Sequence, residues 1–226
     1  MKNYIILSEK PWHKEMFQNL QETFPDYKWN LITSKVDFQQ DHLIELKPDK
    51  IFIPHWSYII PKAIYENYEC VVFHMTDLPY GRGGSPLQNL ILRAKEKTKI
   101  SALKVQKGLD TGPVYLKKDM MLYGTAQEIF IRTTAIVEEM IKEIIHDTLE
   151  PQPQSGKITE FKRRRPEDGD ISKISDIDKI YDFIRMLDCE GYPAAFFENE
   201  HFRFEFSRAS LKSENKILAD VRIIKK

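Results

Sequence analysis

The fold is indicated by a short apolar run that leads into a glycine-rich turn, residues 70–86, with the sequence CVVFHMTDLPYGRGGSP. An uninterrupted apolar run of this length, bounded by turn residues, is typical of a buried β-strand, here Cys70–His74. In sheets built from strand–helix–strand units, ligands bind beyond the carboxyl ends of the strands. His74 and the turn that follows it occupy such a position.

The rest of the first two thirds of the chain repeats this alternation of apolar runs and helix-period segments. The other predicted strands are Tyr4–Leu7, Trp29–Thr33, Lys50–Pro54, Ile100–Val105 and Val114–Met121. The predicted helices are Trp12–Phe24, His42–Leu46, Lys62–Tyr68, Pro86–Ala94 and the long segment Thr125–Leu149. Repeated units of this kind predict an α/β fold with a Rossmann-like parallel sheet and right-handed crossovers.

A proline-rich segment, Pro151–Gly156, interrupts the pattern and is interpreted as a linker. Beyond it come a basic run, Lys162–Arg165, an acidic stretch, and a predicted helix, Asp176–Leu187. The last predicted strands are Ala194–Phe197, His201–Ser207 and Ala219–Ile224. We therefore expect two domains, residues 1–150 and a small C-terminal α+β module at residues 156–226.

Composition gives no indication of nucleic-acid binding, disulfides or insertion into a membrane. The 34 Lys and Arg residues balance 34 Asp and Glu residues, so no net basic field favours nucleic acid or an anionic membrane surface. Cys70 and Cys189 lack metal-type spacing and are expected to be buried, reduced thiols. No segment is predicted to be a signal peptide or a membrane span, so a cytoplasmic protein is expected. A bound metal is not expected.

Two residues suggest proton-transfer chemistry. His74 ends a strand, and Asp110 lies in the tight loop Lys107–Pro113. Such a carboxylate can orient an imidazole and stabilise its protonated form. Taken singly, His74 is more often a structural histidine, Asp110 a turn residue, and the glycines of residues 81–84 a surface turn. The spacing of these glycines is not G-x-G-x-x-G, and no glycine directly follows the first predicted strand. A dinucleotide-binding site is therefore not expected.

Four segments, in order, resemble the folate-dependent formyltransferases, a family that includes methionyl-tRNA formyltransferase, nucleotide-sugar N-formyltransferases and the gramicidin formylation domain. They are Trp56–Lys62, His74 with Leu78-Pro79, Arg82–Pro86, and Gly108–Gly112. The family's C-terminal module has counterparts in Arg165–Gly169 and Gly191–Ala194. The resemblance implies that residues 1–150 form the catalytic domain of an N-formyltransferase.

The resemblance also implies roles for particular residues. His74 and Asp110 would be catalytic, and the co-substrate would be 10-formyltetrahydrofolate. Its pterin would be held by Tyr58, Ile59, Ile60, Pro61, Gln106, Gly108 and Leu109. The acceptor would be bound by Arg82, Gly83 and Thr76, because a guanidinium binds phosphate or carboxylate in bidentate fashion. Without that role, Arg82 is an ordinary solvated loop residue.

The chain departs from the family at Val72, where the family has an asparagine that donates a hydrogen bond to the oxyanion. Losing one such donor costs about 2.7–4 kcal/mol in the barrier. Thr76, Asn89 or a backbone N–H would have to replace it. A catalytically weak folate- or nucleotide-binding homologue is therefore an alternative, as is a 10-formyltetrahydrofolate hydrolase.

The acceptor expected from the charge balance is a nucleotide-linked amino sugar, as in surface-polysaccharide biosynthesis, including a pseudaminic-type pathway. Binding of tRNA would favour a basic surface, because neutralised phosphates dominate affinity for nucleic acid. The basic run at Lys162–Arg165 is followed at once by Glu167, Asp168 and Asp170. Neither nucleic acid nor a membrane is expected as a partner. Transfer to another amine and assembly as a homodimer stay open.

Overall fold

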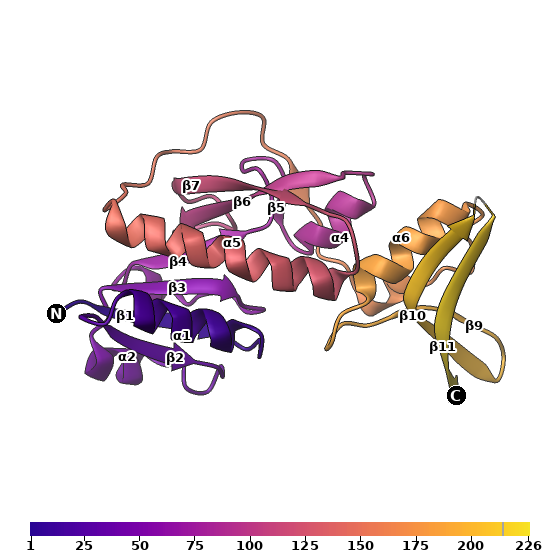
Figure 1. The fold of residues 1–226 in the computed structure, drawn as a ribbon, viewed down its shortest axis with the longest axis horizontal. Helices are drawn as coiled ribbons and strands as arrows, with labels where there is room; N and C mark the ends of the chain where they lie inside the picture. The colour runs from indigo at the N-terminus through magenta and orange to yellow at the C-terminus, as the bar shows by residue number, and fades with distance from the viewer. Residues whose placement is uncertain (214) are drawn as a thin grey trace. The chain divides into compact units, whose positions relative to one another are not determined.

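The computed structural model describes residues 1–213 and 215–226. These residues divide into two compact units, each built from several stretches of chain (Figure 1). The first unit contains Met1–Arg82, Lys99–Met120 and Ile131–Glu160. The second contains Gly83–Thr98, Met121–Phe130 and Phe161–Lys226, so it draws on more of the chain than the expected module at residues 156–226.

In the described part of the first unit, a six-stranded sheet has the order β2-β1-β3-β4-β6-β7. Its strands are β1 (Asn3–Ser8), β2 (Lys28–Ile32), β3 (Lys50–His55), β4 (Cys70–His74), β6 (Lys97–Lys104) and β7 (Val114–Met121). All six residues of β1 are buried, as expected for an interior strand. The Rossmann-like α/β fold predicted from the sequence is confirmed.

The direction of β6 differs from the prediction. β1 pairs in parallel with β2 and β3, and β3 pairs in parallel with β4. β6 is antiparallel to β4, with His74 opposite Ser101. The segment between these strands therefore returns to the edge where β4 ends instead of crossing the sheet, and the expectation of an entirely parallel sheet was wrong here.

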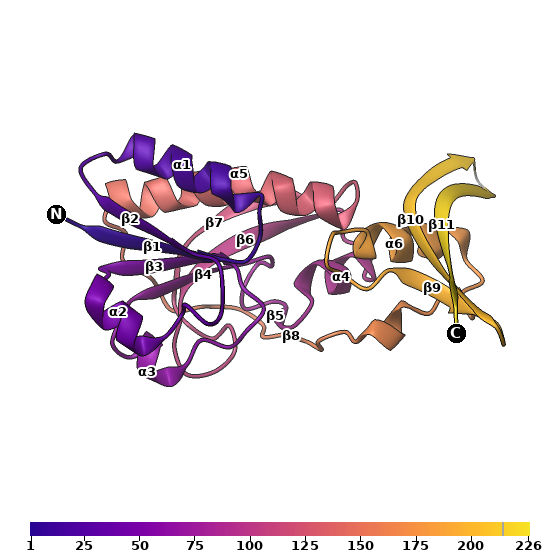
Figure 2. The same ribbon diagram turned by 90° about the horizontal axis from the view of Figure 1, so that it is seen from below.

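Helices cover both faces of this sheet. Figure 2 shows α1 (His13–Thr23) and α5 (Ala126–His146) on one face, with α2 (Gln40–Leu46) and α3 (Lys62–Tyr65) on the other. The amide of Asn19 donates to Glu138 at 3.0 Å, which joins α1 to α5. On the opposite face, the core cluster consists of Ile5, Leu7, Ile32, Phe38, Leu43, Ile51, Ile53, Ile60, Ile64 and Cys70. Burial of these side chains supplies the main driving force for this unit.

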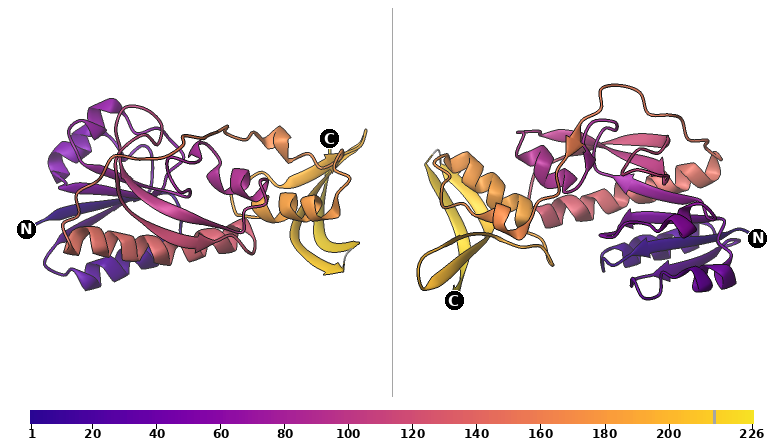
Figure 3. Two further views of the ribbon diagram at one scale, coloured as in Figure 1. Left: turned by 90° about the horizontal axis from the view of Figure 1, so that it is seen from above. Right: turned by 180° about the vertical axis from the view of Figure 1, so that it is seen from behind.

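The second unit contains α4 (Pro86–Ile91), a 3₁₀ turn (Pro166–Gly169), α6 (Ile177–Leu187) and an antiparallel sheet of order β11-β10-β9. Its strands are β9 (Ala195–Glu198), β10 (Phe202–Ser213) and β11 (Lys216–Lys225). The side chain of Asp176 caps α6 by accepting from the amides of Asp178 and Lys179. Figure 3 shows β10 and β11 as a long curved hairpin. The short strands β5 (Arg82–Gly83) and β8 (Glu160–Phe161) pair with each other.

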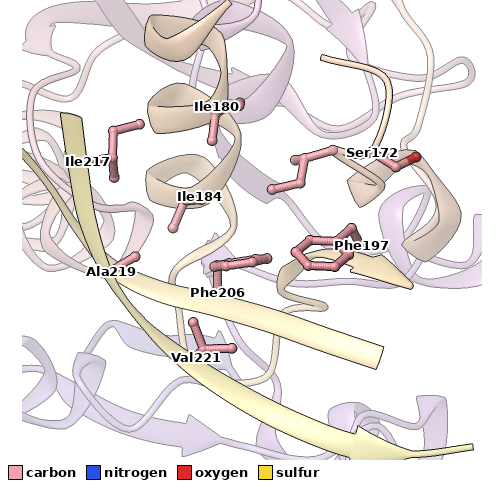
Figure 4. Close-up of a pocket in the computed structure, with 9 residues that line it drawn as sticks. Ser172, Ile180, Ile184, Phe197, Phe206, Ile217, Ala219 and Val221 are labelled. Carbon is pink, nitrogen blue, oxygen red and sulfur yellow. The ribbon is translucent and has the colours of Figure 1, made fainter. Parts of the chain in front are cut away.

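A pocket of about 590 Å³ lies within the second unit, between α6 and the sheet (Figure 4). It is lined by Ile171, Ser172, Ile180, Ile184, Phe197, Phe206, Ile217, Ala219 and Val221. None of these side chains is ionisable, so the pocket offers apolar surface and no acid–base group.

Candidate active site

His74 is the last residue of β4, and its side chain is 8% exposed. Its Nε2 atom lies 2.8 Å from the carbonyl oxygen of Gly81, and its Nδ1 atom lies 3.6 Å from a carboxylate oxygen of Asp110. The chain can make the first contact because Gly81, with φ of 76°, turns it back towards the strand end. The structure therefore brings together the two residues predicted to be catalytic.

Asp110 lies in the loop between β6 and β7, and its side chain is 12% exposed. Its φ of 52° is uncommon for a residue other than glycine, although aspartate tolerates this region. The loop is held close to β6 because Gly112 has no side chain: a Cβ atom there would lie 1.7 Å from the carbonyl oxygen of Lys104. Within the loop, the Thr111 hydroxyl donates to the carbonyl of Lys107 at 2.9 Å. A tight turn thus aims the aspartate at the histidine.

The partners of His74 determine where its protons can lie. A carbonyl oxygen can only accept, so Nε2 carries a hydrogen. The remaining nitrogen, Nδ1, faces the carboxylate of Asp110. At 3.6 Å this is an ion-pair distance rather than a hydrogen bond. Nδ1 and the carboxylate thus face each other in the way that acid–base chemistry requires.

Thr76, which was expected to bind substrate, is completely buried. Its hydroxyl donates to the carbonyl of Gly81 at 3.3 Å, and its own carbonyl accepts from the Ser101 hydroxyl at 2.7 Å. The Ser101 hydroxyl in turn accepts from the Leu78 amide at 3.3 Å. These bonds assign Thr76 and Ser101 to shaping the turn beneath His74. They do not support substrate contact by Thr76.

Arg82 is bound to a residue that the sequence analysis did not select. Its Nε and Nη2 atoms donate to Oε1 of Gln154, at 3.1 and 2.9 Å. Gln154 lies in the segment interpreted only as a linker. A proline-rich stretch has no periodicity from which to infer the direction of a side chain. The contacts of Gln154 with Arg82 and with the Asp110 loop could be found only from the structure.

Gly83 belongs to the second unit, where a Cβ atom on it would lie 2.3 Å from the carbonyl oxygen of Phe161. The structure gives Gly83 a packing role there. Asn89, a suggested replacement for the missing asparagine, is also in the second unit and donates to the carbonyls of Gly84, Ser85 and Lys162. Its amide nitrogen is therefore already engaged. Val72, which stands in the asparagine's place, packs against the core cluster of the first unit.

The residues predicted to hold the pterin fall in two loops of the first unit. Tyr58, Ile59, Ile60 and Pro61 connect β3 to α3, and Gln106, Gly108 and Leu109 precede Asp110. Ile60 is buried in the core cluster, against which Trp56 and Val105 also pack. Ile59 and Leu109 are exposed, at 86% and 61%. Both loops are thus anchored in one core, and each leaves an apolar side chain exposed.

Two further histidines, His13 and His55, lie near the carboxyl ends of β1 and β3. The ring centroids of His13 and His55 lie 6.5 Å apart, and Ser8 bonds to Nδ1 of His13. Burial lowers the pKa of His13 to about 3, with contributions from His55 and Lys10. Burial and Lys10 lower the pKa of His55 to about 4. Both rings are therefore neutral at physiological pH.

Cys70 and Cys189 are buried thiols, as expected. Burial raises the pKa of the Cys70 thiol to about 12, which makes it unreactive at neutral pH. In residues 1–213 and 215–226, no cluster of His, Cys, Asp and Glu could hold a metal ion. No helix in the same residues is long and apolar enough to cross a membrane.

A buried histidine at the carboxyl end of β4, paired with a carboxylate from the β6–β7 loop, is an arrangement suited to acid–base chemistry. The formyl transferase family matches residues 9–137, and the C-terminal domain of methionyl-tRNA formyltransferase matches residues 166–224. The chain belongs to the formyl transferase family, whose members use 10-formyltetrahydrofolate as the formyl donor.

Three relatives illustrate its place in this family. A methionyl-tRNA formyltransferase from Clostridium thermocellum is 50% identical over the full length of both chains, with a TM-score of 0.97. The methionyl-tRNA formyltransferase of Francisella philomiragia is 28% identical over 84% of this chain and 66% of its own length. A sugar N-formyltransferase from Shewanella is 15% identical over 88% of this chain and 94% of its own, with a TM-score of 0.70, and shares the fold.

The chain spans between half and two thirds of the length of the curated relatives it matches first. The full-length agreement is with the solved structure from Clostridium thermocellum. The balanced charge of the chain favoured the nucleotide-sugar branch, whereas the relatives with higher identity carry the name methionyl-tRNA formyltransferase.

Proposed function

We propose that this protein transfers the formyl group of 10-formyltetrahydrofolate to a primary amine, with His74 and Asp110 as the catalytic pair. The observation that carries the proposal is the 3.6 Å approach of Asp110 to Nδ1 of a buried histidine whose Nε2 is already committed to Gly81. This arrangement leaves one nitrogen for proton transfer and places a negative charge beside it.

The reaction forms a bond between the amine nitrogen and the formyl carbon and breaks the bond from that carbon to N10 of the folate. The amine gives up one proton and N10 gains one. The pair can hold that proton at Nδ1 of His74, because the Asp110 carboxylate stabilises the imidazolium. General acid–base catalysis of this kind contributes about 10²–10⁴-fold to a rate.

Two loops form the proposed binding site for the folate. The 56–61 loop and the 105–109 loop present exposed apolar side chains, and both pack into one core cluster. Tyr58 and Ile59 would cover one part of the pterin, and Leu109 would cover another. We assign Gln106 and Gly108 to the same proposed binding site through their position in the second loop.

The first acceptor candidate is the amino group of methionyl-tRNA. It is supported by 50% identity to a protein of that name and by the match of the second unit to the corresponding C-terminal domain. In the basic run, the side chains of Lys162, Arg163 and Arg165 are exposed, whereas Arg164 is half-buried with its guanidinium over Phe183. The exposed members would contact phosphates.

The second candidate is the nucleotide-linked amino sugar predicted from the sequence. It is favoured by the zero formal net charge, which gives no broad basic field for tRNA. The likeness to a sugar N-formyltransferase concerns the fold and does not choose between acceptors.

The test is to measure release of tetrahydrofolate and formation of formylated product with methionyl-tRNA, with a panel of nucleotide-linked amino sugars, and with no acceptor. Product with tRNA alone selects the first candidate, and product with a sugar alone selects the second. Release of tetrahydrofolate without acceptor, at the same rate as with every amine, would replace both with hydrolysis. If wild-type protein makes no product and releases no tetrahydrofolate, the proposal is wrong.

A further inference from the structure

Gln154 bonds to two parts of the candidate site that lie far apart in the sequence. Its Oε1 atom accepts from Nε and Nη2 of Arg82, and its Nε2 atom donates to the carbonyl oxygens of Asp110 at 2.8 Å and Gly112 at 2.7 Å. All four residues lie in the first compact unit. One side chain thus joins the candidate acceptor-binding arginine to the loop that carries the candidate catalytic aspartate.

The orientation of this amide follows from its partners. A guanidinium only donates and a carbonyl only accepts, so the oxygen of Gln154 must face Arg82 and the nitrogen must face the loop. A reversed amide would lose all four bonds. Both hydrogens on Nε2 are used. No other neutral side chain of this length offers a forked donor and an acceptor at one end.

The neighbouring glutamine provides a contrast within the same segment. Gln152 is exposed, and its side chain donates at 3.3 Å to the carbonyl of Glu150, two residues away. Its backbone, by contrast, pairs with that of Val114 in both directions at 2.8 Å, so the segment is anchored independently of the Gln152 side chain. This anchor places Gln154 over the Asp110 loop.

We propose that Gln154 is a positioning residue for formyl transfer, which fixes Arg82 and the Asp110 loop in one mutual geometry. The inference rests on the proposed function and extends it. Because the amide holds the backbone on both sides of Thr111, it limits how far the Asp110 carboxylate can move from Nδ1 of His74. Because it holds Arg82 by two donors, it also limits where the guanidinium can meet the acceptor.

Two substitutions separate the two ends of the amide. Gln154→Ala removes both connections. Gln154→Glu keeps an oxygen acceptor for Arg82 but removes the donor to the Asp110 and Gly112 carbonyls. Gln152→Ala is the matched control, since it removes a glutamine side chain from the same segment without touching the site. Each protein is first compared with wild type by thermal unfolding, and folded protein is used for the rest.

With each acceptor that wild type uses, we expect Gln154→Ala to lower kcat by about 10- to 100-fold, as misplacement of reacting groups by about 1 Å does. We also expect it to raise the acceptor KM. Gln154→Glu should lower kcat to a similar extent and leave the acceptor KM near the wild-type value, because Arg82 keeps its partner. Gln152→Ala should match wild type in both. If the role of Gln154 were purely structural, the two variants would not differ in acceptor KM while sharing a lowered kcat.

Amide hydrogen exchange of residues 107–113 provides a readout that does not depend on activity. Exchange in this loop should be faster in both Gln154 variants than in Gln152→Ala, because the loop loses its external bonds. If wild type catalyses no formyl transfer, the proposed function fails while exchange still decides whether Gln154 holds the loop. If the Gln154 variants equal Gln152→Ala in exchange and in kinetics, the positioning role is overturned.

Discussion

The Nε2 atom of His74 lies 2.8 Å from the carbonyl oxygen of Gly81, so the ring donates from this nitrogen and presents Nδ1 to Asp110. A backbone carbonyl, seven residues along the chain, therefore determines which histidine nitrogen faces the carboxylate. The turn that supplies this carbonyl is held by the buried hydroxyls of Thr76 and Ser101. The geometry of the pair is thus built into the turn that follows β4.

Replacing either member of the catalytic pair should abolish most turnover and leave the fold intact. We expect His74→Ala and Asp110→Ala each to lower kcat by about 10²–10⁴-fold, because each removes proton transfer at Nδ1. Rates of formyl transfer and thermal unfolding curves would be measured together. The exposed His201 provides the control, and His201→Ala should behave as wild type. Near-normal kcat in both pair variants would show that the assignment is wrong.

Substituting asparagine at position 72 tests whether the departure from the family matters. Val72 packs against the core cluster, so Val72→Asn should lower the free energy of unfolding by about 1–3 kcal/mol, the cost of burying an unsatisfied amide. Turnover per folded molecule should not fall by orders of magnitude, since the family accommodates asparagine there. Urea unfolding and kcat measure the two effects. A large loss of both would indicate that this site has been rebuilt around valine.

Arg82 should act mainly on acceptor binding. Arg82→Ala is expected to raise the acceptor KM by more than it lowers kcat, because a guanidinium that holds a phosphate or carboxylate contributes in ground and transition states alike. Steady-state kinetics with the accepted amine measures both constants. A fall in kcat with KM unchanged would show instead that Arg82 interacts with the acceptor only in the transition state.

Salt dependence should distinguish the two acceptor candidates. With a nucleotide-linked amino sugar, kcat/KM should change little between 50 mM and 200 mM salt, because one or two ionic contacts release few counterions. With methionyl-tRNA it should fall more steeply, since neutralising three phosphates through the exposed residues of the basic run reduces affinity by about 20- to 40-fold over this range. The comparison uses the same enzyme preparation with both acceptors. A steep fall with a sugar acceptor would contradict this account of its binding.

The protein should lose stability as pH falls from 7 to 5. The pKa values of His13 and His55 are about 3 and 4 in the folded protein, against 6.5 for an ordinary histidine. The unfolded chain therefore binds more protons in this window, and stability decreases with decreasing pH. At about 1.4 kcal/mol for each unit of pKa, we expect a loss of about 2–4 kcal/mol from the pair.

Urea unfolding at several pH values measures this loss. His55→Gln removes one titrating ring, and the slope of stability against pH should fall by about half, because the two rings contribute similar terms. His201→Gln, which changes an exposed ring, should leave the slope unchanged. An unchanged slope in His55→Gln would show that other groups cause the pH dependence.

The sequence alone determined the strands and helices whose residues carry a clear period. Cys70–His74 and Val114–Met121 were predicted with the bounds that the structure has. For Cys70–His74 the reason is an apolar run that leads into a glycine-rich turn. The position of His74 at a strand end followed from the same pattern. Its pairing with Asp110 was predicted because the chain resembles a known family.

The tertiary structure decided the direction of β6, the burial of Thr76 and the contacts of Gln154. A buried strand has the same apolar pattern whether its neighbour is parallel or antiparallel, so the pairing of β6 with β4 could not be predicted from its residues. Gln154 lies 44 residues from Asp110 and 72 from Arg82, in a segment without periodicity. Contacts over such separations depend on where the chain returns after folding, and local sequence patterns record only which side of an element is buried.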